Sequence, residues 1–403
     1  MSNDALKVGY FVAGISSQAS GLATAIQGWS DAVSKFTPAQ IRLYTVQCQQ
    51  KGFTDFELEP PAQLIREPGS WSFRLNRSTA LKQRIMHDSV ELDLYHNHCI
   101  WTMPSYYAHL ASQSQRRPLM ITPHGAMNDV ALKRSSFKKS IIRWIFQSKV
   151  IEKASCFHAF TQNEAESIRK SGVTQPIAII PNGIALPDVE DSGDSTTLGE
   201  GAALLEQFPE LKNKKIVLFL ARLHPIKGID YLIPAWAELA KRNPDWQLVL
   251  AGPDGGHLSW IESEIASKNL NDHVTLTGPL YGSMKQSAFE AAELFLLPSY
   301  SEGFSMTVLE ALAHRVPVLI SDQCNFPEVA SENAGLICKT ETTDLMKVLQ
   351  QMISMSENDR MTMGNRGRQM VESNYTWETV AQKMHRVYQW QVDGQRPDDV
   401  EIV

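Results

Sequence analysis

Short apolar runs alternate with stretches of helical periodicity along the chain, and this alternation restricts the possible fold more than any other feature. The runs cover residues 7–13, 41–46, 92–96, 119–122, 156–160, 177–180, 215–220, 246–251, 274–277 and 294–297. Strands that alternate with helices form parallel sheets with helices on both faces, the doubly wound α/β class. In such sheets ligands bind at the carboxyl ends of the strands, so functional groups are expected at those positions.

The length and one linker-like segment predict two domains. A chain of 403 residues is long for a single hydrophobic core. Residues 187–201 are acidic, small and aperiodic, which is linker composition, and a new buried strand begins at 215. We therefore predict domains over 1–190 and 191–375, with 376–403 as a closing helical segment.

Bulk composition excludes several classes of protein. The net charge is −6 and no long basic run dominates, so the chain is not built to coat nucleic acid. The five cysteines include no Cys-x-x-Cys pair, which favours reduced thiols in a cytosolic protein over disulfides or a zinc site. The apolar N-terminal run is too short for a signal peptide, and no run approaches 18 apolar residues, so only peripheral membrane contact is expected.

The segment 298–328 carries the most specific chemistry. Glu302 lies in a turn after the apolar run 294–297, and Glu310 lies on the helix that begins near Ser305. The N–H groups at the start of that helix, at Ser305, Met306 and Thr307, have no partner within the helix and can bind an anionic or hydroxyl-rich ligand. Glu310 is too far along the helix to contact the same atoms as Glu302, so the two carboxylates are expected to contact different parts of one ligand.

The string EGFSMTVLEALAHRVPV resembles the Glu-x7-Glu segment of the retaining glycosyltransferases of family 4. The resemblance implies the GT-B architecture, in which two Rossmann-like doubly wound domains face each other across a cleft. It also implies that Glu302 lies beside the transferred sugar and that Glu310 hydrogen-bonds the nucleotide ribose. The sequence departs from the family at Arg315, where a glycine is usual.

Arg222 and Lys227 bracket a turn between the strand 215–220 and the helix that follows. Two cations beside a helix start can neutralise a diphosphate. The segment resembles the family's Arg-x4-Lys-Gly motif, which implies that both side chains bind the phosphates of the donor. The loop before Gly21 is a second candidate phosphate loop, with Ser20-Gly21 where the family usually has two glycines; a plain strand-to-helix turn is the alternative. Its spacing does not match the motif that binds NAD.

Three histidines stand near predicted strand ends. His124 in the string PHGAM resembles the family's His-Gly turn, which implies that its ring faces the donor sugar; a structural loop histidine is the alternative. His96 and His98 alternate along one strand and suggest a metal site, but no third ligand follows at a recognisable spacing, so cleft lining or packing is favoured. The resemblance also places Leu280 beside the nucleobase.

Residues 132–153 are rich in lysine and arginine interleaved with aromatic and aliphatic residues. Two interpretations stay open: a peripheral contact with an anionic membrane, or a surface helix whose basic side chains cover its own packing face. At the other end of the chain, the resemblance implies that the final helix crosses back to the first domain. We expect the tail 393–403 to be loosely held.

Together these features predict a metal-independent glycosyltransferase without a cofactor, and the resemblance implies that it retains the anomeric configuration. Its donor would be a nucleoside diphosphate sugar carrying a hexose, and its acceptor a saccharide or lipid-linked saccharide of bacterial surface polysaccharide synthesis. No Asp-x-Asp motif is present to bridge a metal to the diphosphate. Predicted catalytic residues are His124 and Glu302. The alternatives are a nucleotide-sugar isomerase or phosphorylase on the same scaffold, and a non-catalytic nucleotide-sugar binding protein.

Overall fold

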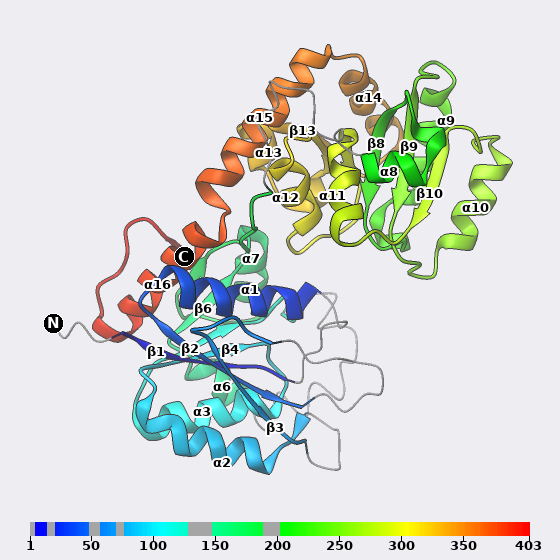
Figure 1. Cartoon of the computed structure of the whole chain (residues 1–403). Coiled ribbons are helices and arrows are strands. Elements are labelled where there is room, and N and C mark those ends of the chain that lie inside the picture. Colours follow the sequence, from blue (N-terminus) through cyan, green and yellow to red (C-terminus); the bar gives the residue numbers. More distant parts are fainter. Residues whose placement is uncertain (1–4, 14–20, 48–56, 70–75, 128–146, 188–201) are drawn as a thin grey trace. The chain divides into compact units, whose positions relative to one another are not determined.

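The computed structural model describes residues 5–13, 21–47, 57–69, 76–127, 147–187 and 202–403 (Figure 1). The chain divides into two compact units, residues 1–183 with 377–403 and residues 184–376. The domain boundary predicted at residue 190 lies outside the described residues, as do the loop that precedes Gly21 and most of the basic segment 132–153. The end of that segment forms the short helix α6 (Ser148–Glu152).

The first unit is built on a sheet with the strand order β14-β7-β6-β5-β4-β1-β2-β3 among the described residues. All neighbours pair in parallel except β14, which runs antiparallel to β7. The strands are β1 (Lys7–Phe11), β2 (Gln40–Val46), β3 (Gln63–Glu67), β4 (Leu94–His98), β5 (Leu119–Thr122), β6 (Cys156–Ala159), β7 (Ile177–Ile179) and β14 (Glu401–Ile402). Its helices are α1 (Gly21–Phe36), α2 (Thr79–Asp88), α3 (Met103–Gln115), α6, α7 (Gln162–Lys170) and α16 (Trp377–Asp393). Apart from β2 and β3, the described strands of this unit alternate with helices, as the hydrophobic pattern predicts.

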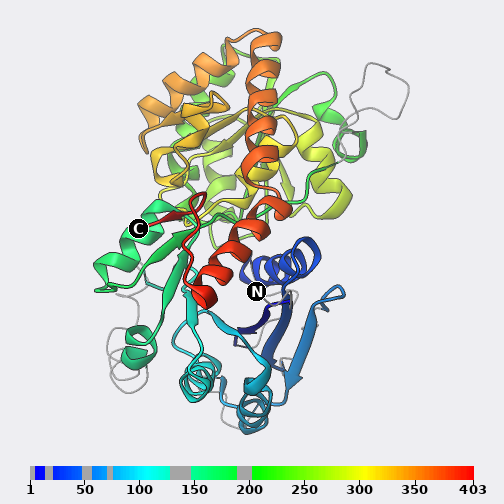
Figure 2. The same ribbon diagram turned by 90° about the vertical axis from the view of Figure 1, so that its left-hand side faces the viewer.

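The last long helix, α16, belongs to the first unit and packs against α1 (Figure 2). Trp377 fills the space above two glycines: a Cβ added at Gly28 would lie 2.2 Å, and one at Gly183 2.5 Å, from its ring atoms. At the other end of α16, the buried Tyr388 hydroxyl lies 2.7 Å from that of Tyr10 on β1. A tight apolar contact and a buried polar contact thus fix the helix at both ends.

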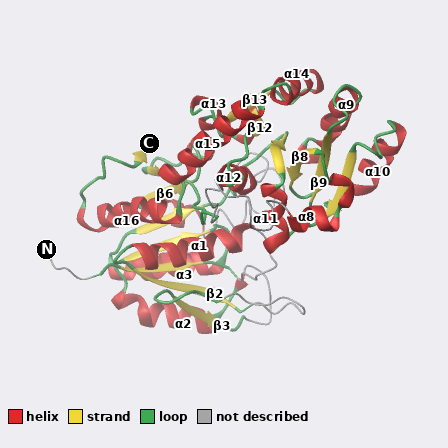
Figure 3. Cartoon of the chain, turned by 45° about the horizontal axis from the view of Figure 1, so that its top comes forward, coloured by secondary structure: helices red, strands yellow, loops and turns green. Residues whose placement is uncertain are grey.

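The second unit is a parallel sheet with the order β10-β9-β8-β11-β12-β13. Its strands are β8 (Lys215–Leu220), β9 (Trp246–Ala251), β10 (Val274–Gly278), β11 (Ala292–Leu297), β12 (Val318–Ser321) and β13 (Gly335–Cys338). Its helices are α8 (Ala202–Gln207), α9 (Ile229–Ala240), α10 (Leu258–Ser267), α11 (Gly282–Glu290), α12 (Met306–Ala313), α13 (Glu328–Ser331), α14 (Thr342–Ile353) and α15 (Glu357–Asn374). Figure 3 shows these helices around the strands. The central strands are buried along nearly their whole length, as expected for a sheet covered on both faces.

Each sheet contains one point where the strand order reverses direction. In the second unit the chain moves outward from β8 through β9 to β10, returns to the other side of β8 with β11, and continues through β12 to β13. In the first unit the reversal falls between β1 and β4. The loops after the two strands at such a point diverge, which opens space for a ligand. The candidate residues that follow β8 and β11 therefore lie where a doubly wound sheet binds ligands.

The tail differs from its expectation of loose structure. Val403 exchanges two backbone hydrogen bonds with Ile177, of 2.9 and 3.0 Å, and its carbonyl also accepts a hydrogen bond from the Arg169 guanidinium. Arg386 of α16 forms an ion pair with Asp399 in the tail. The tail is ordered because it covers the open edge of β7, which no other described strand pairs. Within the described part of the chain, no helix combines the length and apolar character needed to cross a bilayer.

Candidate active site

In the second unit, residues predicted to bind the phosphates and the sugar lie at the point of strand reversal. Arg222 and Lys227 follow β8, and Glu302 follows the adjacent parallel strand β11. Pro225–Lys227 form one turn of 3₁₀ helix, capped by the His224 ring, whose Nδ1 accepts from the Ile226 N–H at 3.1 Å. The Arg222 side chain is exposed, and neither a hydrogen bond nor an ion pair links it to the described residues.

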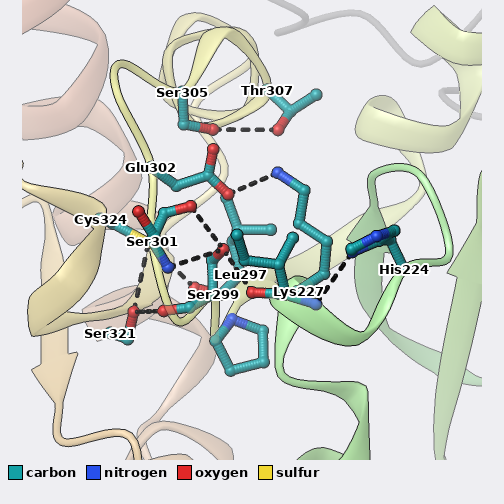
Figure 4. A network of polar contacts seen from close by, with 12 residues as sticks. His224, Lys227, Leu297, Ser299, Ser301, Glu302, Ser305, Thr307, Ser321 and Cys324 are labelled. Atoms are coloured by element: carbon teal, nitrogen blue, oxygen red, sulfur yellow. Dashed lines mark hydrogen bonds and ion pairs between the residues drawn. The ribbon is translucent and has the colours of Figure 1, made fainter. Parts of the chain in front are cut away.

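Lys227 and Glu302 form a close ion pair. The Lys227 Nζ lies 2.5 Å from Glu302 Oε1, and the two side chains are only 17% and 11% exposed. Figure 4 shows the lysine reaching across from its turn to the carboxylate. A lysine ammonium group has three donors, so Lys227 can hold this carboxylate and still donate to a phosphate.

The turn that carries Glu302 is fixed through its backbone. The Glu302 N–H donates to the Gln323 carbonyl at 3.1 Å, and the Asn325 side chain donates to the Glu302 carbonyl at 2.8 Å. Asn325 has a φ of 55°, a left-handed conformation that asparagine adopts more readily than most residues. The segment 322–328 therefore supports Glu302.

Helix α12 begins beside this turn. Ser305 is its N-cap residue, and its side chain makes no cap hydrogen bond with the helix backbone; its hydroxyl lies 3.2 Å from that of Thr307 (Figure 4). The first-turn N–H groups, starting at Met306, thus lack a side-chain acceptor, which is the condition for binding an anion at a helix start. Leu280, the predicted nucleobase contact, is buried just before α11, and Tyr281 beside it is 72% exposed.

Glu310 lies one turn further along α12 and forms an ion pair that the sequence analysis did not predict. Lys285 of α11 places its Nζ 2.6 Å from Glu310 Oε1. The second carboxylate oxygen, Oε2, is buried and has no hydrogen-bond partner among the described residues. Burial raises the pKa of Glu310, and the positive charge of Lys285 opposes that rise.

In the first unit, His124 lies in a strained turn directly after β5. Its φ is 52° and that of Gly125 is 73°, so two successive residues adopt the left-handed conformation. Glu164 of α7 holds this turn: one oxygen accepts the Gly125 N–H at 2.7 Å and the other accepts the Phe160 N–H at 2.9 Å. The Thr161-x-x-Glu164 spacing is typical of a helix capping box, but the bond to Gly125 could not be read from it.

The half-buried His124 ring adjoins a cluster of buried imidazoles, those of His96, His98 and His158. Its Nε2 lies 3.1 Å from His98 Nδ1, and the His98 ring packs 4.4 Å from that of His96. His96 bonds the Tyr388 hydroxyl at 2.8 Å and the Thr122 hydroxyl at 2.7 Å, and Thr122 also contacts His158 Nδ1 at 2.9 Å. His96 and His98 therefore take part in packing and hydrogen bonding that orders the strand ends.

The imidazoles of this cluster and that of His124 are all held neutral. Burial lowers the pKa of His124 to about 3 and that of His158 to about 4. Burial also lowers the pKa values of His96 and His98 far below the ordinary range, and the neighbouring imidazoles add to the effect. A neutral His124 ring offers one donor and one acceptor nitrogen, which suits hydrogen bonding to a sugar hydroxyl and does not provide a cation.

The structure thus brings Lys227 and Glu302 into contact, places Arg222, Leu280, Ser305, Met306, Thr307 and Glu310 in the same unit, and places His124 and Gly21 in the other. Gly21 is the first residue of α1. Sequence reasoning missed Lys285, Glu164 and Asn325 as partners of these residues. Within the described residues, no group of three or more histidine, cysteine or acidic side chains is arranged to hold a metal ion.

Comparison with known protein families accounts for most of the chain. Residues 13–183 match the family described as "Glycosyl transferase 4-like domain", and residues 203–370 match "Glycosyl transferases group 1". The two matches fall on the two units in order. They agree with the resemblance drawn from the Glu-x7-Glu, Arg-x4-Lys-Gly and His-Gly motifs.

Several curated proteins are related at low identity. A D-inositol 3-phosphate glycosyltransferase of Nocardia farcinica is 26% identical over 75% of this chain and 68% of its own length. A protein of the same name from Mycobacteroides abscessus is 26% identical over 66% of this chain and 59% of its own length. An alpha-D-kanosaminyltransferase of Streptomyces kanamyceticus is 28% identical over 56% of this chain and 58% of its own. The chain therefore spans somewhat more than half the length of the last two relatives.

Solved structures share the fold over nearly the whole chain. Sucrose-phosphate synthase from Thermosynechococcus elongatus is 20% identical with a TM-score of 0.72, covering 97% of this chain and 100% of the other. HepE of Anabaena, solved with UDP and glucose, is 17% identical with a TM-score of 0.67, covering 95% and 99%. The two family matches and the shared architecture confirm the predicted fold class, and the chain belongs to the family 4-type glycosyltransferases of the GT-B fold.

Proposed function

We propose that this glycosyltransferase transfers a hexose from a nucleoside diphosphate sugar to a saccharide or lipid-linked saccharide of bacterial surface polysaccharide synthesis, with retention of configuration and without a metal ion. The observation that carries the proposal is the Lys227–Glu302 pair at the strand reversal of the second unit. In this pair the cation proposed to bind the diphosphate contacts the carboxylate proposed to position the sugar. The structures of HepE with UDP and UDP-glucose support a nucleotide-sugar donor.

In this reaction negative charge develops on the β-phosphate as its bond to the sugar breaks, and the enzyme must stabilise that charge. Arg222, Lys227 and the N–H groups at the start of α12 are the groups proposed to stabilise it. Fixed donors aimed at a developing charge are commonly the largest contribution to catalysis, and here they take the place that a divalent ion has in other transferases. Glu302 is proposed to position the sugar, and the backbone bonds from Gln323 and Asn325 keep its turn in place.

His124 is proposed to hydrogen-bond a hydroxyl of the transferred sugar, Glu310 the ribose, Leu280 the base, and Gly21 the diphosphate. The buried carboxylate oxygen of Glu310 that lacks a partner supports its role, because a ligand hydroxyl would satisfy it. The proposal includes the saccharide or lipid-linked saccharide acceptor. It also includes a peripheral contact of residues 132–153 with the inner face of the membrane.

The first experiment asks whether the protein binds nucleoside diphosphates. Thermal-shift measurements with UDP, GDP, ADP and dTDP should show one that stabilises the protein, by about 2.7 kcal/mol at 100-fold its dissociation constant. Release of that diphosphate from its hexose conjugate should then require a saccharide acceptor and survive EDTA, and the product should keep the donor's anomeric configuration. Release without any acceptor would favour an isomerase or phosphorylase instead.

Three variants test the assigned residues. Arg222→Ala and Glu310→Ala should each weaken nucleotide binding by about 10- to 100-fold, the loss expected for a hydrogen bond to a charged group. His124→Ala should leave nucleotide binding within about twofold and lower kcat by 100-fold or more, since one good catalytic contact contributes on that order. Unaltered turnover in all three variants would show that the site is assigned wrongly.

A further inference from the structure

The ion pair between Lys285 and Glu310 joins two different helices, α11 and α12. Lys285 lies in the first half of α11, and its Nζ is 2.6 Å from Glu310 Oε1 in α12. The two side chains are 28% and 24% exposed, so the pair is partly withdrawn from water. Only one carboxylate oxygen is used, because Glu310 Oε2 is buried and no residue in the described part of the chain bonds it.

An ion pair that served only to stabilise the fold would be expected to have partners for both carboxylate oxygens of Glu310. A structural carboxylate normally satisfies both oxygens, since a buried polar atom without a partner is costly. The pair of Glu264 in α10 with Lys268, the C-cap residue of that helix, offers a comparison. Its Nζ–Oε2 distance is 3.5 Å, and its side chains are 34% and 29% exposed. The Lys285–Glu310 pair is shorter, spans two helices and leaves one oxygen buried without a partner.

The charges around Glu310 make Lys285 the group that decides its ionisation. Desolvation raises the pKa of Glu310, and the ammonium of Lys285 opposes this through its charge and its hydrogen bond. His314, one turn further along α12, is kept neutral because burial lowers its pKa to about 4. Arg368 of α15 donates to the Ala313 carbonyl and pairs with Glu372. Loss of Lys285 would therefore leave a carboxyl group that protonates nearer to neutral pH.

We propose that Lys285 is a positioning residue for the nucleotide: it keeps Glu310 ionised and occupies one oxygen, so that the other is presented to the 2′- and 3′-hydroxyls of a ribose. This inference rests on the proposed function, in which Glu310 binds the ribose. It goes further, since it makes Lys285 a determinant of the preference for ribonucleotides over 2′-deoxyribonucleotides. A carboxylate aligned by a cation accepts hydrogen bonds from hydroxyls more strongly than a protonated carboxyl group does.

The test compares each diphosphate with its 2′-deoxy form, using UDP and 2′-deoxy-UDP, or the GDP or ADP pair if wild type binds those better. Calorimetry at pH 7 should show that wild type prefers the ribose form by about tenfold, the value of one charge-assisted hydrogen bond. In Lys285→Met and in Glu310→Gln the preference should fall to within about twofold. The double variant should show no further loss, because both changes remove the same contact.

Controls separate this role from folding and from phosphate binding. Lys285→Arg keeps the charge and should keep most of the preference, and Lys268→Met, which removes the matched pair on α10, should leave it unchanged. In Lys285→Met the preference should rise as the pH is raised above 7, because burial raises the pKa of Glu310 and a higher pH favours its ionised form. This pH dependence would not arise from a general loss of packing.

Two results would overturn the inference. If Lys285→Met weakened the ribose and deoxyribose forms equally, Lys285 would contact the phosphates or the base. If its effect added to that of Glu310→Gln, the two residues would act independently. A wild-type protein that binds no nucleoside diphosphate would reject the proposed function itself, whereas normal binding with an unchanged ribose preference in the variants would reject only the role of Lys285.

Discussion

Lys227 must serve two anions if a diphosphate binds at the strand reversal of the second unit. Its ammonium lies 2.5 Å from Glu302, and both side chains are mostly buried, so solvent screens their interaction weakly. The carboxylate therefore competes with the diphosphate for the same cation and repels it. This competition is tolerable only if Glu302 contributes more to the transition state than it costs in nucleotide affinity.

Glu302→Gln should accordingly separate binding from catalysis. The amide keeps the shape of the side chain and removes its charge, so the nucleoside diphosphate should bind about fivefold more tightly, a gain of roughly 1 kcal/mol. The kcat should fall by about 100-fold or more, because the carboxylate beside the sugar is lost. Calorimetry with the diphosphate and steady-state kinetics with the hexose donor measure the two effects separately.

The control is Glu264→Gln, which removes a carboxylate from the half-buried Lys268–Glu264 pair at the end of α10. It should change neither quantity. Weaker diphosphate binding in Glu302→Gln would contradict the competition, and would mean that Glu302 orders Lys227 for the phosphate instead.

The sequence shows which charged residues follow the strands. It does not show which distant side chains form ion pairs with them. The spacing of Glu302 and Glu310, and of Arg222 and Lys227, follows from local strand, turn and helix geometry, which a sequence displays. Lys285 is 25 residues from Glu310 and meets it only after two helices pack. Its sequence signal, a lysine on an amphipathic helix, is that of a solvated surface charge.

At the scale of elements, Gly228 connects the Lys227 turn to helix α9 against the end of β11. Its φ is 72°, and a Cβ at this position would lie 1.8 Å from the Pro298 carbonyl oxygen. The same carbonyl accepts a hydrogen bond from the buried Tyr231 hydroxyl. The absence of a side chain at residue 228 therefore lets α9 and β11 approach closely enough for Lys227 to reach Glu302.

Gly228→Ala should destabilise the second unit and weaken nucleotide binding together. Backbone strain alone costs about 1 kcal/mol, and the collision with fixed backbone should raise the loss to roughly 3 kcal/mol or more. Gly256→Ala is the matched control, because Gly256 has a φ of 90° but nothing lies within 4 Å of the added Cβ. Urea denaturation of both variants measures the difference, and equal losses would show that the contact with Pro298 relaxes easily.

Elements with strong local patterns were predicted well, and those that depend on distant partners were not. The buried runs of β8, β9 and β11 coincide closely with predicted strands, because strands covered on both faces are continuously apolar. Strand β3 is only partly buried along its length and was missed. Strand β14 forms because the edge of β7 is available, a fact that the tail sequence does not contain.

At the scale of the whole molecule, the two units differ in how many buried neutral imidazoles they hold. Burial lowers the pKa values of His96, His98, His109, His124, His158 and His385 in the first unit, and of His257 and His314 among the described residues of the second. Most of the first group surrounds the ends of β4, β5 and β6. The two units should therefore respond differently to acid.

The sign of the effect follows from proton uptake. A histidine whose pKa is lowered in the folded state stays neutral there, whereas the unfolded chain binds a proton below about pH 6.5. Its stabilising contribution is complete above pH 6.5 and is lost as the pH falls toward the folded pKa. Asp31, whose pKa burial raises to about 6, and Glu164, whose pKa burial also raises, act in the opposite direction but are fewer.

The first unit should thus lose stability before the second as the pH falls from 7 to 5.5, by about 1 kcal/mol for each fully buried histidine. Hydrogen exchange corrected for intrinsic rates should show protection falling in peptides of β4 and β5 while β8 and β9 keep theirs. Replacing the buried His109 with Gln should flatten the decline by about one histidine's share, and the exposed His87→Gln should not. Protonation of the imidazole cluster can destabilise only the unit that contains it. If both units lost protection together, or if the second unit lost it first, the cluster would therefore not be what limits stability in acid.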